Sequence, residues 1–230
     1  MTVPCAVAVI VAAGKGSRIG DNRNKLLLPL GTSTILENTL NPFLKHSRIQ
    51  KIFLAVSLQD HQLIKKLIPE EVILVRGGKR RQDSVHNALE EVMKEKNTPE
   101  AVLIHDGARP FCSLNLIDRI LDATKSHDAA IPIMPINDTV RRITLEKTNV
   151  VERKGLYAVQ TPQGFRPEQI YAASLKAKKT EVTDDASMLE KMSQRVATVE
   201  GEVHNIKITT QDDLKQARWI INLMNHVRIK

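Results

Sequence analysis

The side chains most able to do chemistry lie in a glycine-rich loop near the amino terminus. The apolar run at residues 7–11 predicts a buried strand, and it leads into a loop that holds three glycines and several cations, among them Arg18, Arg23 and Lys25; the glycines are Gly14, Gly16 and Gly20. A strand that ends in such a loop presents backbone N–H groups and positive charge to a phosphate. The loop therefore predicts a polyphosphate site, and the alternative is a solvated, flexible connection between a strand and a helix.

The spacing of these glycines excludes two familiar nucleotide motifs. After Gly14 and Gly16, the dinucleotide fingerprint requires a third glycine where this chain has Ile19. No Gly-Lys-Ser or Gly-Lys-Thr sequence closes the loop, so it is not a P-loop either. The loop is a phosphate-binding candidate of another kind.

Two more loops of the same character follow predicted strands. The strand predicted at 72–75 leads into a run of glycines and cations at 76–81, and the one at 101–104 leads into the sequence His-Asp-Gly-Ala-Arg-Pro at 105–110. In an open parallel sheet, ligands bind beyond the carboxyl ends of the strands. The three glycine-containing loops would therefore lie along one edge, and this edge is the predicted site.

These residue types suit the transfer of a nucleotidyl group from a nucleoside triphosphate. The loop N–H groups and Arg18 would hold the phosphates, Lys25 could reach the same charge, and Mg²⁺ would neutralise the remainder. If the second substrate is a phosphate monoester, its second pKa of about 6 leaves it largely ionised, so its oxygen can attack the α-phosphate without a general base. Catalysis then requires positioning and cationic stabilisation of a charge-rich transition state.

The other titratable residues admit plainer interpretations. Asp106 could contact a metal ion or the substrate, or it could cap the next helix. We interpret His105 as structural and His204, which has no partner at metal-ligand spacing, as a surface residue. Asp184 and Asp185 are typical of negative charge at the start of a helix.

Strand and helix patterns alternate along most of the chain. Strands are predicted at 7–11, 51–57, 72–75, 101–104, 129–134 and 195–200, with a further one at 205–209. Helices are predicted after the capping-box pair Thr34 and Glu37, at 60–68, around 85–93, after Ser113, at 167–178, at 184–192 and after Thr210. This alternation predicts a single α/β domain over residues 1–230, with a Rossmann-like open, mostly parallel twisted sheet and helices on both faces.

The alternation is interrupted between about 137 and 158. Two short β-prone pieces, near 142–145 and 149–153, surround a polar turn, and no helix pattern separates them. They predict an antiparallel hairpin arm that extends from the main sheet. Because an isolated hairpin is at best marginally stable, we expect it to dock on something, plausibly a second subunit.

Composition limits the classes of partner. The chain has 230 residues, 34 Lys and Arg against 26 Asp and Glu, and only 3% aromatic residues. Few rings are available to stack on single strands, so small phosphorylated ligands are favoured over a nucleic acid, although a basic nucleic-acid-binding module is the alternative. The two cysteines, Cys5 and Cys112, fit a reducing compartment, and we expect a cytoplasmic protein without a membrane span.

Eight motifs along almost the whole chain resemble the 2-C-methyl-D-erythritol 4-phosphate cytidylyltransferases of the non-mevalonate isoprenoid pathway. In order, they are AAGKGSRIG, NKLLLPLG, GGKRRQDSV, HDGARP, DTV, ERKGLYAVQTPQGF, TDDASMLE and NIKITTQDDL. The resemblance implies transfer of CMP from CTP to methylerythritol phosphate with Mg²⁺ or another divalent cation. It also implies a cytoplasmic homodimer whose hairpin arms are swapped between subunits.

The resemblance implies roles for individual residues. The implied catalytic residues, which stabilise the transition state or place the acceptor for attack, are Arg18, Lys25, Arg153 and Lys207. The implied CTP contacts are Ala12, Ala13, Gly14, Gly78, Asp83 and Ser84. The implied contacts to the sugar phosphate are Asp106, Arg109, Thr139, Thr161 and Thr183. The metal ligand is left open between Asp106 and the phosphates of CTP.

The chain departs from the family pattern beside the loop lysine. The family often has proline before this lysine and glutamine after it, whereas Asn24 and Leu26 flank Lys25 here. The departure bears on the rigidity of the loop. The related ribitol 5-phosphate cytidylyltransferases are the alternative, but the His-Asp-Gly-Ala-Arg-Pro stretch is more similar to the methylerythritol enzymes.

Overall fold

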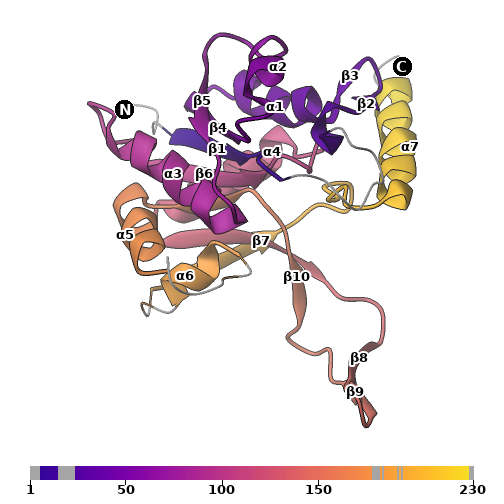
Figure 1. Cartoon of the computed structure of the whole chain (residues 1–230). Helices are drawn as coiled ribbons and strands as arrows, with labels where there is room; N and C mark the ends of the chain where they lie inside the picture. Colours follow the sequence, from indigo (N-terminus) through magenta and orange to yellow (C-terminus); the bar gives the residue numbers. More distant parts are fainter. Residues whose placement is uncertain are drawn as a thin grey trace.

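The computed structural model describes residues 6–14, 24–177, 182, 184–190, 192 and 194–227. Among these residues, one eight-stranded sheet has the order β10-β7-β11-β6-β1-β4-β5, with β12 also paired to β7 (Figure 1). Its strands are β1 (Ala6–Val11), β4 (Ile49–Val56), β5 (Val72–Arg76), β6 (Ala101–Asp106), β7 (Ala129–Pro135), β10 (Tyr157–Val159), β11 (Gln163–Phe165) and β12 (Val196–Glu200). Strands β5, β4, β1 and β6 are parallel, as is the pair β7 and β12. The predicted α/β class and mostly parallel sheet are confirmed.

Helices cover both faces of the sheet. One face packs on α1 (Ile35–Lys45), α4 (Leu114–Thr124) and α7 (Gln211–Val227), and the other on α3 (Arg81–Met93), α5 (Pro167–Ala177) and α6 (Ala186–Glu190). The alternation within β1 shows why its sequence is apolar throughout. Ala8 and Ile10 belong to the first core, whereas Val7 and Val9 belong to the second. A strand buried on both faces requires apolar residues at every position.

The predicted helix starts are set by side-chain caps. The Thr34 hydroxyl accepts from the Glu37 N–H at 3.2 Å, and the Glu37 carboxylate accepts from the Thr34 N–H at 2.7 Å, which makes the expected capping box of α1. Ser113 caps α4 through the Leu116 N–H at 3.0 Å. The second helix, α2 (His61–Lys65), is shorter than the predicted 60–68 because its last residues form tighter turns.

Two features of the sheet differ from the prediction. Strands β10 and β11 run antiparallel beside β7, and β11 lies between β7 and β6. Each is three residues long, which is too short for a periodic pattern. The prediction of a strand at 205–209 is wrong. The carbonyls of Asn205 and Ile208 form no ladder, because they accept hydrogen bonds from the side chains of Arg109 and Lys25, respectively.

The predicted hairpin is present and projects away from the body of the molecule (Figure 1). It is formed by β8 (Val140–Ile143) and β9 (Thr148–Val151), which pair only with each other. Its apolar side chains lack a core, since Ile143 is 78% exposed and Leu145 is fully exposed.

Among the described residues, none of the helices combines the length and the apolar character that a membrane span requires.

Candidate active site

The three glycine-containing segments meet at the carboxyl ends of β1, β5 and β6. They enclose a cavity of about 250 Å³. Its lining comes from the end of β1, the turn after residue 24, the loop before α3, the end of β6 and the segment before α7: Val11, Ala12, Ala13, Gly14, Lys25, Leu26, Gly78, Lys79, Arg80, Arg81, Ser84, Asp106, Gly107, Ala108 and Lys207. The prediction that one sheet edge would gather these loops is confirmed by this geometry.

Two glycines let the loops approach each other at backbone distance. The Gly77 N–H donates to the Val56 carbonyl at 2.8 Å, and a Cβ on Gly77 would lie 2.2 Å from the Cβ of Ala13. The Gly107 N–H donates to the Val11 carbonyl at 2.9 Å, and a Cβ there would lie 2.9 Å from the same oxygen. Side chains at either position would push apart the strand ends that form the cavity.

Asp106 is the centre of the charge arrangement. Its Oδ1 accepts from Arg81 Nε at 2.8 Å, its Oδ2 lies 2.7 Å from Lys207 Nζ, and Arg109 Nε lies 3.8 Å from Oδ2. Its backbone N–H donates to the Thr161 hydroxyl at 3.0 Å. Burial alone raises the pKa of this carboxyl, but the charges of Arg81 and Lys207 outweigh it and hold the pKa well below its usual range. Asp106 is therefore a fixed anion.

Arg81 joins Asp106 to a second carboxylate that is completely buried. Its two Nη atoms donate to the two oxygens of Asp185 at 2.9 and 2.8 Å, while Nε reaches Asp106. Burial lowers the pKa of Arg81, but Asp185 and Asp106 more than offset it and raise the pKa overall. Asp185 directly precedes α6, as its interpretation as charge at a helix start requires, but its carboxylate pairs with Arg81. Asp184 does cap α6, accepting from the Ser187 N–H at 3.1 Å.

Sequence reasoning missed Arg81 as a site residue. It lies at the first position of α3, within the cationic run that follows β5, but nothing in that run distinguishes it from Lys79 or Arg80. The two carboxylates that it binds, those of Asp106 and Asp185, lie 25 and 104 residues away along the chain.

Two lysines from different segments of the chain line the cavity. Lys25 opens the short 3-10 turn Lys25–Leu27, and its Nζ donates to the Ile208 carbonyl at 2.8 Å. Lys207 comes from the segment before α7 and binds Asp106. Both ammonium groups belong to one region of positive charge, which can attract and hold a polyphosphate.

His105 is a buried structural residue. Its Nε2 contacts the Arg109 carbonyl at 3.0 Å, and its Nδ1 contacts the Thr161 hydroxyl at 3.1 Å. Burial lowers the pKa of His105 to about 4, so the ring is neutral at neutral pH. Both ring nitrogens are engaged by Arg109 and Thr161, which also contact Asp106, so His105 supports the site and is not placed to act on a substrate. His204 is exposed, as expected for a surface residue.

The structure does not bring every predicted residue to the cavity. Ala12, Ala13, Gly14, Gly78, Ser84, Lys25, Asp106 and Lys207 line it, and Thr161 and Arg109 lie directly behind Asp106. Asp83 is absent from this lining, because its carboxylate binds the backbone and side chain of Arg80. Thr139 and Arg153 are exposed at the base of the arm, where Arg153 donates to the Asn137 carbonyl. Arg18 and Thr183 lie outside the described residues.

The carboxylates of the site do not fit a directly bound metal ion. In the part of the chain that the structure describes, no three His, Cys, Asp or Glu side chains converge as a metal site would require. Asp106 is surrounded by Arg81, Lys207 and Arg109, which would repel a dication placed on its oxygens.

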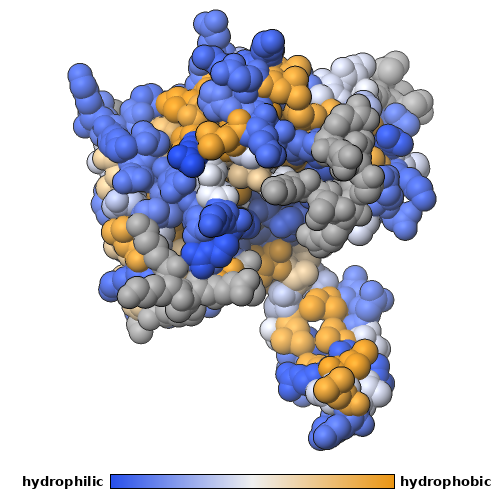
Figure 2. Space-filling model, viewed as in Figure 1, coloured by the Kyte–Doolittle hydropathy of each residue, from blue (hydrophilic) through white to orange (hydrophobic). Residues whose placement is uncertain are grey.

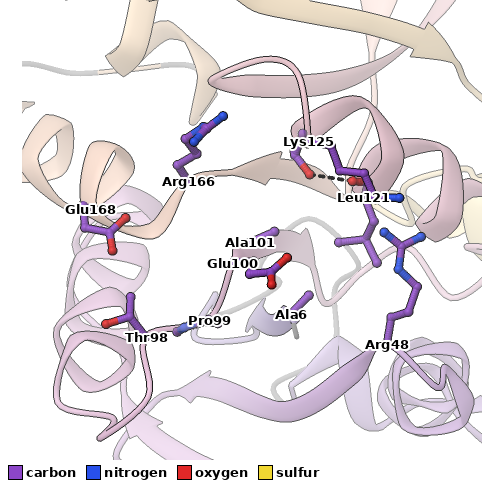
Figure 3. A pocket seen from close by; sticks show the side chains of 11 residues that line it. Ala6, Arg48, Thr98, Pro99, Glu100, Ala101, Leu121, Lys125, Arg166 and Glu168 are labelled. Atoms are coloured by element: carbon purple, nitrogen blue, oxygen red, sulfur yellow. Dashed lines mark hydrogen bonds between the residues drawn. The ribbon is translucent and has the colours of Figure 1, made fainter. Parts of the chain in front are cut away.

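A hollow of about 430 Å³ lies at the opposite edge of the sheet (Figure 3). Ala6 and Ala101, at the amino ends of β1 and β6, line it together with the mixed charges of Arg48, Arg166 and Glu168. None of the predicted site residues lies here, and parallel sheets bind ligands at the other edge.

Comparison with known proteins points to one family. A family model described as 2-C-methyl-D-erythritol 4-phosphate cytidylyltransferase matches residues 6–223. A protein of that name from Bacillus cytotoxicus is 41% identical over 223 residues, which cover 94% of this chain and 97% of that protein. One from Shouchella clausii is 40% identical over 93% of this chain and 95% of its own.

Solved structures give the same result. The 4-diphosphocytidyl-2C-methyl-D-erythritol synthase of Anaerococcus prevotii superposes with a TM-score of 0.81 at 31% identity, covering 96% of this chain and all of that one. The 2-C-methyl-D-erythritol 4-phosphate cytidylyltransferase of Thermus thermophilus superposes with a TM-score of 0.78 at 32% identity, covering 94% and 98%.

Proposed function

This chain belongs to the 2-C-methyl-D-erythritol 4-phosphate cytidylyltransferase family, and we propose that its transfer of CMP takes place in the cavity at the carboxyl ends of β1, β5 and β6. The enzyme transfers CMP from CTP to 2-C-methyl-D-erythritol 4-phosphate, giving 4-diphosphocytidyl-2-C-methyl-D-erythritol and pyrophosphate. The observation that carries the assignment of the cavity is the convergence of Lys25 and Lys207 beside the ionised Asp106.

The reaction is a phosphoryl substitution at the α-phosphorus of CTP. An oxygen of the acceptor phosphate forms the new P–O bond, the bond to the bridging oxygen of the β-phosphate breaks, and pyrophosphate leaves with that electron pair. The acceptor phosphate is largely ionised at neutral pH, so no side chain has to remove a proton. The demand on the protein is cationic stabilisation, which Lys25, Lys207 and Arg18 supply in this proposal.

The nucleotide lies against the glycine loops. Ala12, Ala13 and Gly14 form one wall of the cavity, and Gly78 and Ser84, on either side of the start of α3, line it as well. Backbone N–H groups at such a wall can bind the nucleotide. In this arrangement Asp83 contributes indirectly, through Arg80. It fixes Arg80, which lines the same wall, through hydrogen bonds at 3.0 to 3.1 Å and a shorter one at 2.6 Å.

The polyol phosphate lies on the Asp106 side. A buried, ionised carboxylate is a strong acceptor for hydroxyl groups, and Asp106 is the group of this kind that lines the cavity. Arg109 and Thr161 hold it in place, and Lys207 remains close enough to bind the acceptor phosphate. Thr183 completes the set by resemblance.

We propose that the divalent cation enters with CTP, as the metal complex of its phosphates. The cations around Asp106 oppose direct binding of a dication by the protein, whereas a triphosphate offers several anionic oxygens. In this proposal Mg²⁺ is part of the substrate.

The acceptor is tested by measuring pyrophosphate release with CTP and either methylerythritol phosphate or ribitol 5-phosphate. We expect turnover with the first acceptor only. Turnover on ribitol 5-phosphate and none on methylerythritol phosphate would overturn the acceptor. Tight binding of a nucleic acid, without pyrophosphate release from either mixture, would favour a basic binding module.

We also propose that the enzyme is a homodimer whose arms cross to the partner. Apolar side chains are exposed on the arm (Figure 2). Ile143, Leu145, Val150 and Tyr157 are each at least half exposed, and docking would cover them. Arg153 and Thr139 lie at its base, exposed and away from the cavity lining of their own chain. In a swapped dimer they would complete the partner's site.

Mixed dimers test the swap. Lys25→Ala and Arg153→Ala homodimers should both be nearly inactive. When the two variants are refolded together, random pairing makes about half of the dimers mixed, and half of the sites in these would be intact, so about a quarter of wild-type activity should return. Activity that stays at the mutant level, with mixed dimers confirmed by differential tags, would contradict the swapped arm.

We propose a cytoplasmic location. Cys112 is a free, buried thiol in the described part of the chain, which fits a reducing compartment. Fractionation of the producing cells, with the protein detected by antibody, tests this, and recovery from an oxidising compartment would contradict it.

A further inference from the structure

The turn that carries Lys25 is held on both of its sides. Asn24 is only 6% exposed, and its Oδ1 accepts from the Leu26 N–H at 3.0 Å, which caps the turn. Leu26 is 2% exposed and packs in the core against the chain at Gly107. The backbone of Lys25 is therefore fixed between a buried amide and a buried leucine.

The other end of the Asn24 amide reaches a different part of the fold. Its Nδ2 donates to Asp60 Oδ2 at 2.9 Å, and the same oxygen accepts from the Ser57 hydroxyl at 2.7 Å. The Asp60 N–H in turn donates to Ser57 Oγ at 3.1 Å. Ser57 directly follows β4, so these bonds fasten the Lys25 turn to the carboxyl end of β4, which lies between β1 and β5 in the sheet.

The position of Asp60 makes this contact informative. Asp60 stands immediately before α2, where aspartate commonly caps the helix, but its side chain makes no capping bond there. Its carboxylate instead accepts from Asn24 and Ser57. The carboxylate thus binds the local Ser57 hydroxyl and the turn beside the cavity, and it does not cap its own helix.

We propose that Asn24 and Asp60 are positioning residues for Lys25. Lysine has a flexible four-carbon stem, so the place of its ammonium group depends on how firmly its backbone is held. Lys25 Nζ lies 2.8 Å from the Ile208 carbonyl, within the cavity that Lys207 also lines. The inference rests on the proposed role of Lys25 in CMP transfer, because small displacements of a stabilising group slow the chemical step.

Exchanging the two side chains distinguishes the Asn24–Asp60 hydrogen bond from the capping bond between Asn24 and the Leu26 N–H. Asn24→Asp keeps an oxygen for the Leu26 N–H but removes the donor and places a carboxylate against Asp60. We expect kcat per folded site to fall about 10-fold or more, with KM for CTP within about threefold. Asn24→Asp combined with Asp60→Asn restores a hydrogen bond in the reverse direction, and kcat should return to within about threefold of wild type.

Two controls distinguish positioning from general weakening of the fold. In a Lys25→Ala background, Asn24→Asp should cause little further loss of kcat, because no ammonium group is left to position. Asn38→Asp is the matched substitution, since the Asn38 amide also ties neighbouring backbone, at Leu30 and Thr34, but does not hold the Lys25 turn. It should lower the unfolding midpoint while kcat per folded site is unchanged.

The outcomes are separable. Wild-type kcat in Asn24→Asp, no recovery in the swap, or a full additive loss in the Lys25→Ala background would each overturn the positioning role. If Lys25→Ala itself keeps wild-type kcat, the proposed function of Lys25 fails as well. Folded fraction is measured for every variant by circular dichroism and urea unfolding.

Discussion

Removing Arg81 should damage both the fold and the reaction. In Arg81→Met, the guanidinium that joins Asp106 and Asp185 is replaced by an apolar side chain of similar length. Asp185 is fully buried and Asp106 nearly so, and three hydrogen bonds at 2.8 to 2.9 Å are lost together. Breaking a buried ion pair from one side typically costs about 3–5 kcal/mol, because a buried charge is left without compensation.

Lys207 and Arg109 lessen the loss at Asp106 but do not reach Asp185 in the structure. We therefore expect the free energy of unfolding at pH 7.5 to fall by about 3–5 kcal/mol. The value of kcat/KM per folded site should fall by about 10²-fold, because Asp106 is no longer held from the α3 side. The penalty should shrink as the pH falls, since a protonated Asp185 needs no counter-charge.

Urea unfolding and steady-state pyrophosphate release measure these two effects. Arg80→Met is the control for stability: it removes the neighbouring arginine, whose pair with Asp83 is much more exposed, and should cost at most about 1 kcal/mol. Combining Arg81→Met with Asp185→Asn should cost less than the sum of the single variants, by about 2 kcal/mol. A loss below 1 kcal/mol in Arg81→Met, or strict additivity of the two substitutions, would refute the buried ion-pair argument.

Other perturbations follow from the same geometry. The pKa of His105 is about 4 in the folded protein, against an ordinary value of about 6.5, so the unfolded chain binds more protons between these two values. The free energy of unfolding should therefore fall by about 2 kcal/mol from pH 7.5 to pH 5. If a His105→Gln variant shows the same pH dependence in urea titrations, this argument is contradicted. Gly77→Ala should abolish nucleotide binding or folding, because its Cβ would lie 2.2 Å from that of Ala13, and wild-type CTP affinity by calorimetry would contradict the close packing. Thr161→Val removes the acceptor of the Asp106 N–H and should raise KM for the acceptor more than KM for CTP in two-substrate kinetics; an unchanged ratio would show that this bond does not place Asp106.

The edge of the sheet that forms the site could be predicted because each signal was local. The apolar strand at 7–11, the glycines after it, and the similar loops after β5 and β6 each follow from a short stretch of chain. The rule that parallel strands bind ligands at their carboxyl ends then brings them together without knowledge of any contact. The capping box at Thr34 was also local.

The ion pairs of Arg81 with Asp106 and Asp185 could not be predicted, because only the packing of the folded chain brings these residues together. Arg81 is one of several cations in its run, and only the fold places the buried Asp185 opposite it, 104 residues later. The segment at 205–209 has an apolar alternation typical of a strand, yet the side chains of Lys25 and Arg109 take its carbonyls. In the sequence, Asn24 is only a departure from the family pattern, and its bond to Asp60 joins residues that the fold alone brings together.

The role of Lys25 can be tested by comparing single-turnover CMP transfer from CTP to methylerythritol phosphate in wild type, Lys25→Ala and Lys45→Ala. Lys45 is an exposed lysine at the end of α1, outside the cavity lining, and its variant is the control for loss of one positive charge. We expect Lys25→Ala to lower the rate of the chemical step by about 10²–10³, with much less effect on CTP affinity, and Lys45→Ala to match wild type. A Lys25→Ala enzyme within about twofold of wild type would contradict the proposed site.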